Sequence, residues 1–385
     1  MATELFSNLT STTPMRPNTS NTTDSADDSV PLLLGERKWF IIFKYSIYCI
    51  IFLISLIGNM MVCFVVCRRM KVKTVTNYFI MNLAASDLLY TFCVPFDVFA
   101  TVNNAWPYGA IVCRILWPAQ TMAITVSGFT LTALSATRFW AVVKPLRRQL
   151  SVKQTSLVIA ILWILATSTV IPYIHFLNYK SSEQKCDEYW PSHKKRQIYT
   201  ASLLVIQYAL PLTIISTCYL RIGFELTKGQ TKTSNRTLAK ARGKEARRVI
   251  KMLVIVTLVF AILTLPSTIM WMWLDFGQAD QKFRHFWDVV EVLNVFDFLN
   301  CASNPIIYSF CNESFSREFR RQLGCILPGI SPNTSFETGK VSTIMAPIAS
   351  SPSPGNGHAT PLRTSLTKHE NSDSEQNREC AATLL

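Results

Sequence analysis

Residues 40–67 have the sequence FIIFKYSIYCIIFLISLIGNMMVCFVVC, in which Lys44 is the only charged residue. The apolar residues are continuous and show no strand-like alternation with polar ones. A helix needs about 20 such residues to cross ~30 Å of hydrocarbon. In lipid, only helices and closed barrels satisfy their own backbone hydrogen bonds. This stretch therefore predicts a membrane-spanning helix.

Six more stretches of the same kind follow, at about 77–101, 111–142, 154–177, 199–225, 249–274 and 287–310. The 385-residue chain is 49% hydrophobic and only 16% charged, whereas a soluble protein usually has about a quarter charged residues. Seven apolar runs of this length argue against the helices of a soluble core. We therefore expect an all-α membrane protein, folded as a seven-transmembrane helix bundle.

Basic residues collect in every second connection between these stretches. Examples are Arg68, Arg69, Lys71 and Lys73 after the first, Lys144, Arg147, Arg148 and Lys153 after the third, Lys240, Arg242, Lys244, Arg247 and Arg248 after the fifth, and Arg317, Arg320 and Arg321 after the seventh. Loops rich in Lys and Arg remain in the cytoplasm, which places the N-terminus outside. The net charge of +14 is then a topology signal, and we expect no nucleic-acid partner.

The polar head of the chain, residues 1–37, predicts a disordered extracellular N-terminus. It contains Asn-X-Ser/Thr acceptors at Asn8, Asn18 and Asn21, which predict glycosylation on the outer side.

After the predicted membrane-spanning domain at 38–325, residues 326–385 are rich in Pro, Ser, Thr and Gly and predict a disordered cytoplasmic tail. Just before this tail, Phe315, Phe319 and Leu323 recur every four residues among arginines. This pattern predicts a short amphipathic helix on the inner membrane surface. Cys325 follows it as a palmitoylation site or, equally, as an unmodified thiol.

Polar side chains inside membrane spans are costly and usually functional. Asp87 and Ser127 each lie midway along a span, and Asp297, Asn300 and Asn304 share one helix face at i, i+3 and i+7. If these faces converge, they form a polar pocket for a small cation. The alternative is a hydrogen-bonded packing cluster without an ion.

Pro211, Pro266 and Pro305 each lie within a span. Proline frees a backbone carbonyl and kinks the helix. Such a kink serves either as a pivot for a conformational switch or as a static bend.

Cys113 begins the third span, and Cys186 lies in the second outer loop. Both face an oxidising compartment, whereas the other nine cysteines fall in spans or on the inner side. We therefore expect a Cys113–Cys186 disulfide. Arg138 follows Cys113 by 25 residues, or roughly 37 Å of helix, which places it at the cytoplasmic mouth.

From residue 38 to about 325 the chain resembles the rhodopsin-like G protein-coupled receptors. The motifs that carry the resemblance occur in order and in the expected spans. They are Gly58-Asn59, Leu83-Ala84-Ala85-Ser86-Asp87, Cys113 with Arg138, Trp163, Pro211 with Tyr219, Phe260 with Pro266, and Asn304-Pro305-Ile306-Ile307-Tyr308.

The resemblance implies a plasma-membrane receptor that transmits binding of an extracellular ligand to a heterotrimeric G protein. The implied coupling residues are Arg138, Tyr219, Tyr308, Phe260, Pro266, Asn304 and Pro305, and the implied sodium site is Asp87, Ser127, Asn300 and Asn304. Sodium would act there as an allosteric modulator, and no other cofactor is expected. Arrestin and receptor kinases are the further implied partners, through serines and threonines of the tail.

Three positions depart from the family pattern. Thr137 replaces the acid that usually precedes Arg138, Thr264 replaces the tryptophan of helix six, and Gly128 replaces a branched residue. These changes indicate either a weak inactive lock with basal activity or a receptor that binds ligand and signals poorly.

The residues at ligand positions indicate a peptide. Gln120 stands where amine receptors have an aspartate, and the seventh span has no lysine for retinal. With a glutamine at this position, the chain is similar to receptors for neuropeptide Y and for peptides ending in Arg-Phe-amide. In that subfamily an acid at the position of Asp275 pairs with the peptide's arginine; the alternative is a solvated loop acid. Further ligand candidates are Glu188, Glu291, Asp97 and Asp297.

A membrane transporter or channel is the alternative from another class. It predicts repeated halves and broken spans that line a pathway, whereas the sequence shows neither an internal repeat nor a continuous row of charges in the spans. We expect no enzyme, because no zinc-binding cluster, phosphate-binding glycine loop or nucleophile elbow occurs.

Overall fold

The structure is a computed structural model that describes residues 38–69, 74–103, 105–232, 237–284, 286–311, 315–317 and 319–321. The predicted N-terminal segment 1–37 with its glycosylation sites, the tail 326–385 and Cys325 lie outside the described residues. The structure therefore does not test the predictions made for these segments.

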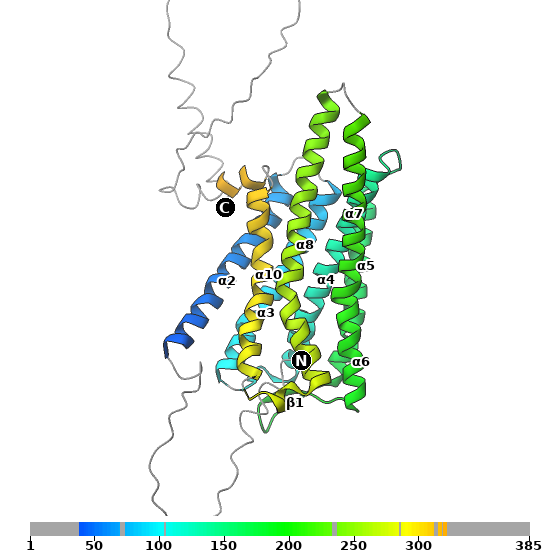
Figure 1. Cartoon of the computed structure of the whole chain (residues 1–385). Coiled ribbons are helices and arrows are strands. Elements are labelled where there is room, and N and C mark those ends of the chain that lie inside the picture. The colour runs from blue at the N-terminus through cyan, green and yellow to red at the C-terminus, as the bar shows by residue number, and fades with distance from the viewer. Residues whose placement is uncertain are drawn as a thin grey trace, which may run out of the picture. The chain divides into compact units, whose positions relative to one another are not determined.

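Seven long helical columns form the bundle in the described part of the chain (Figure 1). They are α2 (Lys38–Phe64) with the π-helical turn η1 (Val65–Arg69), α3 (Val75–Asn103), α4 (Gly109–Val143), α5 (Val152–Phe176), the continuous column α6 (His193–Leu203), η2 (Leu204–Ala209) and α7 (Leu210–Lys232), α8 (Thr237–Gly277), and α10 (Phe286–Cys311). The short helix α9 (Ala279–Lys282) joins α8 to α10. The predicted seven-helix bundle is confirmed.

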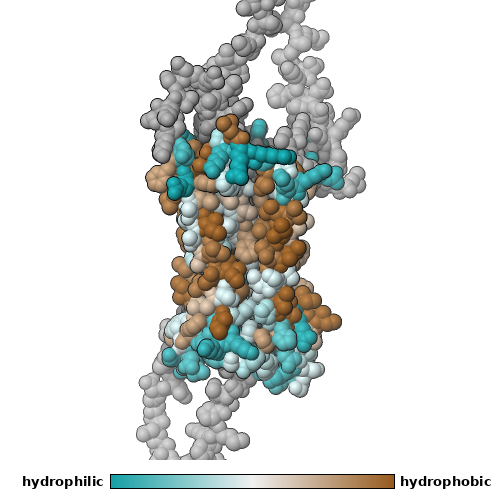
Figure 2. Space-filling view, turned by 90° about the vertical axis from the view of Figure 1, so that its right-hand side faces the viewer, coloured by the Kyte–Doolittle hydropathy of each residue, from teal (hydrophilic) through white to brown (hydrophobic). Residues whose placement is uncertain are grey.

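Six of these columns are long and apolar enough to cross a membrane on length and composition alone. The seventh, α10, carries Asn294, Asp297, Asn300 and Asn304 along its length, and these residues lower its hydropathy. Figure 2 shows a brown apolar belt around the middle of the bundle, with hydrophilic residues at both ends. Exposed apolar side chains such as that of Ile164 on α5 suit a lipid environment.

The helices pack so that α4 contacts α3, α5 and α7, while α10 contacts α2, α3 and α8. At one end α7 and α8 extend beyond their neighbours, and at the other end lies a β-hairpin (Figure 1). The hairpin pairs β1 (Leu177–Lys180) antiparallel to β2 (Lys185–Glu188). The sequence predicted only a loop here, because strands of four residues carry too little periodicity to be recognised. The predicted Cys113–Cys186 disulfide is present and joins the hairpin to α4.

Pro305 in α10 determines a close contact with α2. Proline has no N–H, so the carbonyl of Cys301, four residues earlier, has no helical donor. The side-chain amide of Asn59 donates to this carbonyl at 3.0 Å. A Cβ on Gly58 would lie 2.7 Å from the Pro305 ring, so only glycine permits this approach. The motif residues Gly58 and Asn59 therefore act as one packing element.

The amphipathic helix predicted after α10 is partly described. Residues 315–317 and 319–321 are helical. The buried ring of Phe315 lies 5.9 Å from that of Tyr308. Leu323 lies outside the described residues, and the membrane-surface role stays a prediction.

Candidate functional site

A cavity of about 190 Å³ lies among the helices near the hairpin end of the bundle. Side chains from α2, α3, α4, α5, α6, η2, α8 and α10 line it. Four of the six predicted ligand residues line this cavity, namely Gln120, Asp97, Glu291 and Asp297. Because these four come from three different helices, sequence spacing alone could not show that they converge.

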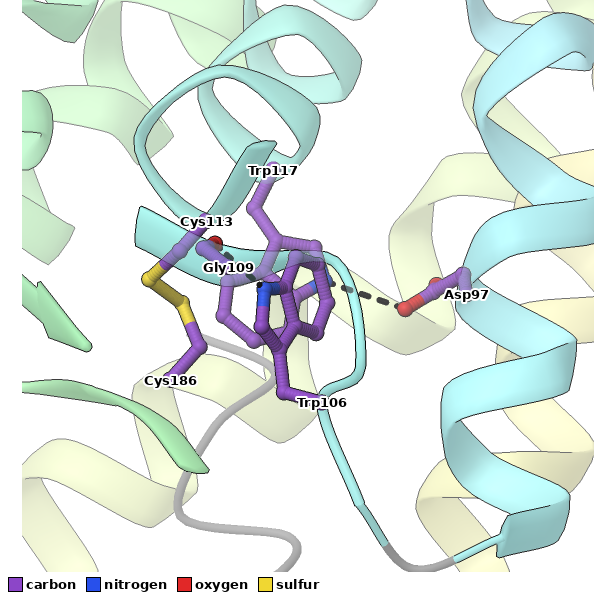
Figure 3. Close-up of a disulfide and its surroundings, with 6 residues drawn as sticks. All are labelled: Asp97, Trp106, Gly109, Cys113, Trp117 and Cys186. Carbon is purple, nitrogen blue, oxygen red and sulfur yellow. Dashed lines mark hydrogen bonds between the residues drawn. A yellow bond between two sulfur atoms is a disulfide. The ribbon is translucent and has the colours of Figure 1, made fainter. Parts of the chain in front are cut away.

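Asp97 lies in the wall of the cavity, where an aromatic pair holds it in place. The indole N–H of Trp117 donates to Asp97 Oδ1 at 3.0 Å. The ring of Trp117 packs against that of Trp106, with 4.7 Å between centroids, and both belong to the buried cluster that contains the disulfide. Figure 3 shows the Asp97 carboxylate directed toward Trp117, beside the disulfide. The disulfide cluster therefore fixes the position of this carboxylate.

Asp297 links α10 to α8. The hydroxyl of Ser267 donates to Asp297 Oδ1 at 2.8 Å. The next residue, Phe298, is buried and its ring lies 6.1 Å from that of Tyr48 and 6.5 Å from that of Tyr90. Aromatic side chains from α2, α3 and α10 thus surround the deep side of the cavity near Asp297.

Glu291 already has a cationic partner. Its carboxylate forms an ion pair with the ammonium of Lys44 on α2, and its main-chain oxygen accepts a hydrogen bond from Tyr48 at 3.2 Å. Both side chains of the ion pair line the cavity. Its charges therefore compensate each other at the rim between α2 and α10.

The surroundings of Asp275 in the structure differ from those predicted from the sequence. Its side chain is 1% exposed, and its Oδ1 lies 2.8 Å from Arg196 Nη2, whose side chain is 13% exposed. The hydroxyl of Thr200 also bonds to the Asp275 carboxylate, and Gln197 Nε2 donates to the Asp275 main-chain oxygen at 2.9 Å. The expectation of a solvated loop acid is wrong. Sequence reasoning missed Arg196, because its partner lies far away along the chain.

Glu188, the sixth ligand candidate, lies on β2 and is not among the residues that line the cavity. Its carboxylate accepts a hydrogen bond from the indole of Trp190 at 2.7 Å. The structure therefore places Glu188 in the hairpin and does not bring it together with Gln120.

The predicted polar layer lies deeper in the bundle. Asp87, Ser127, Asn300 and Asn304 are all buried. Asn304 donates to Asp87 Oδ2 at 2.8 Å, whereas Ser127 bonds to Ser86 at 2.9 Å. In the described part of the chain, Asp87 forms no ion pair, so a buried carboxylate is surrounded by neutral groups. Hard oxygen donors around a buried carboxylate fit a small cation such as sodium.

Beside this layer, α4, η2, α7 and α8 meet at Gly128. A Cβ on Gly128 would lie 3.2 Å from the Gln207 main-chain oxygen, 3.7 Å from Phe260 and 3.8 Å from Pro211. Gly128, Pro211 and Phe260 therefore belong to one packing cluster. Thr264, where the family usually has tryptophan, donates to the main-chain oxygen of Phe260 at 2.8 Å.

Three of the predicted coupling residues, Arg138, Tyr219 and Tyr308, lie toward the end where α7 and α8 extend. Arg138 is half-buried on α4, and Tyr219 is half-buried on α7. Thr137 donates to the main-chain oxygen of Leu134 at 2.8 Å and so bonds within its own helix. Tyr308 is buried against Phe315.

The family model described as 7 transmembrane receptor (rhodopsin family) matches residues 58–308. The chain belongs to the rhodopsin family of seven-transmembrane receptors. This membership confirms the sequence-based resemblance. It also decides against the transporter or channel alternative and confirms that this receptor is not an enzyme.

Several relatives of this receptor match over most of their length. Neuropeptide FF receptor 2 of Mus musculus is 34% identical over 301 residues, which is 71% of each chain. The RYamide receptor of Drosophila melanogaster is 34% identical over 320 residues, 77% of this chain and 67% of its own. Neuropeptide Y receptor type 2 of Bos taurus is 31% identical over 313 residues, 78% of this chain and 81% of its own.

Proposed function

We propose that this rhodopsin-family receptor binds a short extracellular neuropeptide and activates a heterotrimeric G protein. The observation that carries the proposal is the cavity, where Gln120 lies with three carboxylates and aromatic walls between the helices. Pockets of this kind, apolar with a few convergent polar groups, are typical ligand sites. Similarity to receptors named for neuropeptide FF, RYamide and neuropeptide Y supports a peptide as the ligand class.

The proposed topology places the hairpin and cavity outside the cell. The basic connections lie at the opposite end of the bundle, and such loops stay in the cytoplasm. The disulfide lies at the hairpin end, where an oxidising compartment preserves it. The N-terminus is then extracellular and the receptor is a multi-pass protein of the plasma membrane.

Signalling in this proposal is a population shift. A peptide that binds the active arrangement more tightly than the inactive one shifts the equilibrium between them. The kinked helices that contain Pro211, Pro266 and Pro305 are the moving parts, and Phe260 and Asn304 connect them to the bundle. Arg138, Tyr219 and Tyr308 then form the surface for the G protein. The cytoplasmic tail, once phosphorylated by receptor kinases, recruits arrestin.

Asp87, Ser127, Asn300 and Asn304 would hold a sodium ion in the inactive state. A bound sodium ion supplies positive charge that offsets the cost of burying the Asp87 carboxylate. Since the ion would be held between α3, α4 and α10, it favours the arrangement in which these helices are close.

Constitutive signalling is the second candidate function, and Thr137 favours it. In the family an acid at this position restrains the adjacent arginine, whereas Thr137 bonds to its own helix at Leu134. Arg138 therefore has no restraining carboxylate next to it in the sequence. This receptor is expected to activate its G protein to a measurable extent without ligand.

The test is a panel of synthetic peptides ending in Arg-Phe-amide or Arg-Tyr-amide, applied to cells that express the receptor. Calcium and cyclic-AMP readouts are recorded with and without peptide. A saturable, receptor-dependent response to one peptide class supports the neuropeptide function. A high basal signal that no peptide changes supports the constitutive alternative. Absence of both signals at normal surface expression contradicts both.

A further inference from the structure

We propose that the deep part of the cavity is a cation subsite, in which Asp97 and Asp297 together bind a positively charged group of the ligand, a guanidinium or an amine. This inference deepens the proposed function and rests on it for the identity of the ligand as a peptide. It differs from the sequence-based hypothesis, which assigned the ligand's arginine to Asp275.

The charged side chains that line the cavity support this subsite. Three carboxylates and one ammonium are among the side chains that line it. The ammonium of Lys44 pairs with Glu291. Asp97 and Asp297 form no ion pair in the described part of the chain, and their hydrogen-bond donors are the neutral groups of Trp117 and Ser267. Among the described residues, these two carboxylates therefore face the same cavity without a compensating cation.

The two carboxylates are held in place and still have room to bind. A carboxylate has about four lone-pair sites, whereas Asp297 uses one for Ser267 and Asp97 accepts from Trp117 and also interacts with Gln120. Figure 3 shows that the Asp97 carboxylate extends from α3 toward α4 and the disulfide cluster. Because both side chains are already oriented by neutral donors, a ligand cation would meet preorganised acceptors.

The walls between the two carboxylates are aromatic. Tyr48 and Tyr90 both line the cavity. Both rings also pack near Phe298. Aromatic faces attract cations and exclude water, which strengthens a charge-assisted contact with a carboxylate. The site thus suits a cation on a flexible apolar stem, such as an arginine side chain.

Asp275 lacks these properties. Its carboxylate is occupied by Arg196 and Thr200, and it does not line the cavity. A ligand cation would have to displace Arg196 before it reached Asp275. Asp275 therefore serves as a matched control, an acid at the same end of the bundle that already has a cation.

The first experiment needs no peptide. The full-length receptor, purified in detergent, is heated at millimolar concentration with L-arginine amide or with its isostere L-citrulline amide, both acetylated on the α-amine so that citrulline amide carries no charge. We expect arginine amide to raise the melting temperature of the wild type and citrulline amide to leave it unchanged. The variants Asp97→Asn and Asp297→Asn keep an oxygen acceptor for Trp117 and Ser267, and we expect the arginine-specific shift to be lost in both and kept in Asp275→Asn. Equal shifts with both amides, or an unchanged shift in the two cavity variants, would overturn the subsite.

The second experiment uses an agonist from the peptide panel in three forms: unmodified, with arginine replaced by citrulline, and with an acetylated N-terminus. For Asp297→Asn and Asp97→Asn we expect at least a tenfold loss of potency for the form that carries the recognised charge and less than a threefold loss for the form that lacks it. The modification that lowers potency on the wild type shows whether the recognised group is the guanidinium of the arginine or the N-terminal amine of the peptide. Equal losses for charged and neutral forms contradict the subsite, as does a charge-selective loss in Asp275→Asn alone. A wild type that answers no peptide, yet shows the arginine-amide shift, contradicts the neuropeptide function and leaves the subsite supported.

Discussion

The guanidinium of Arg196 on α6 lies 2.8 Å from the carboxylate of Asp275 on α8, and both side chains are largely withdrawn from solvent. This ion pair joins α6 to α8 at the hairpin end of the bundle, whereas along the chain α6 reaches α8 only through η2, α7 and residues 233–236. Breaking a buried pair by removal of one partner leaves the other charge uncompensated. The pair therefore stabilises the contact between α6 and α8.

Asp275→Ala is expected to lower the stability of the receptor by about 3 kcal/mol, because Arg196 would remain buried without its partner. The measurement is the melting temperature of the purified receptor, followed with a thiol-reactive dye. The double variant Arg196→Met with Asp275→Leu removes both charges and is expected to recover most of the loss. A single variant as stable as the wild type would show that the pair contributes nothing.

Gly58→Ala is expected to destabilise the receptor by about 1–3 kcal/mol through overpacking, because the new Cβ would lie 2.7 Å from Pro305. Gly223→Ala on α7 is the matched control, since no other described side chain comes within 4 Å of the position that its new methyl group would take. The control is expected to be neutral, or more stable by up to about 1 kcal/mol through helix propensity. Thermal melting of both variants decides the matter, and equal changes would contradict the packing argument.

Thr137→Asp is expected to lower basal signalling, because an aspartate next to Arg138 supplies the restraining carboxylate that this receptor lacks. A partly exposed ion pair contributes about 1 kcal/mol, which corresponds to roughly a fivefold shift between inactive and active states. The measurement is ligand-independent second messenger at matched surface expression, with Thr137→Asn as the uncharged control. A baseline that is unchanged in Thr137→Asp, or lowered equally in both variants, would show that the missing charge is irrelevant.

Sodium chloride is expected to reduce agonist affinity relative to choline chloride at equal ionic strength, because the Asp87 layer would bind sodium in the inactive state. Asp87→Asn removes the charge while retaining a partner for Asn304, so agonist affinity should become independent of the cation. Agonist binding to membranes in the two salts measures this effect. A wild type with the same affinity in both salts contradicts the sodium site, and so does an Asp87→Asn variant that retains the full sodium effect.

Hydropathy was sufficient to predict the seven helices, because each must satisfy its backbone alone in lipid. Spacing along one helix also predicted the buried layer of Asn300 and Asn304. The partner of Asp275 could not be predicted in this way, since Arg196 stands in a basic outer loop whose pattern looks like a solvated segment. Likewise, no periodicity indicates that Trp117 would orient Asp97, or that Ser267 would meet Asp297, because these contacts depend on how neighbouring helices are rotated.

The most direct measurement is nucleotide exchange on a purified heterotrimeric G protein, with the full-length receptor in lipid nanodiscs. A peptide ending in Arg-Phe-amide or Arg-Tyr-amide that binds the cavity should accelerate exchange above the basal rate. The acceleration should disappear in Arg138→Ala, which retains the cavity and its peptide affinity. If peptides of this class bind the folded receptor and no G protein shows faster exchange, or if Arg138→Ala exchanges as fast as the wild type, then binding in the outer cavity is not transmitted to the cytoplasmic end as described.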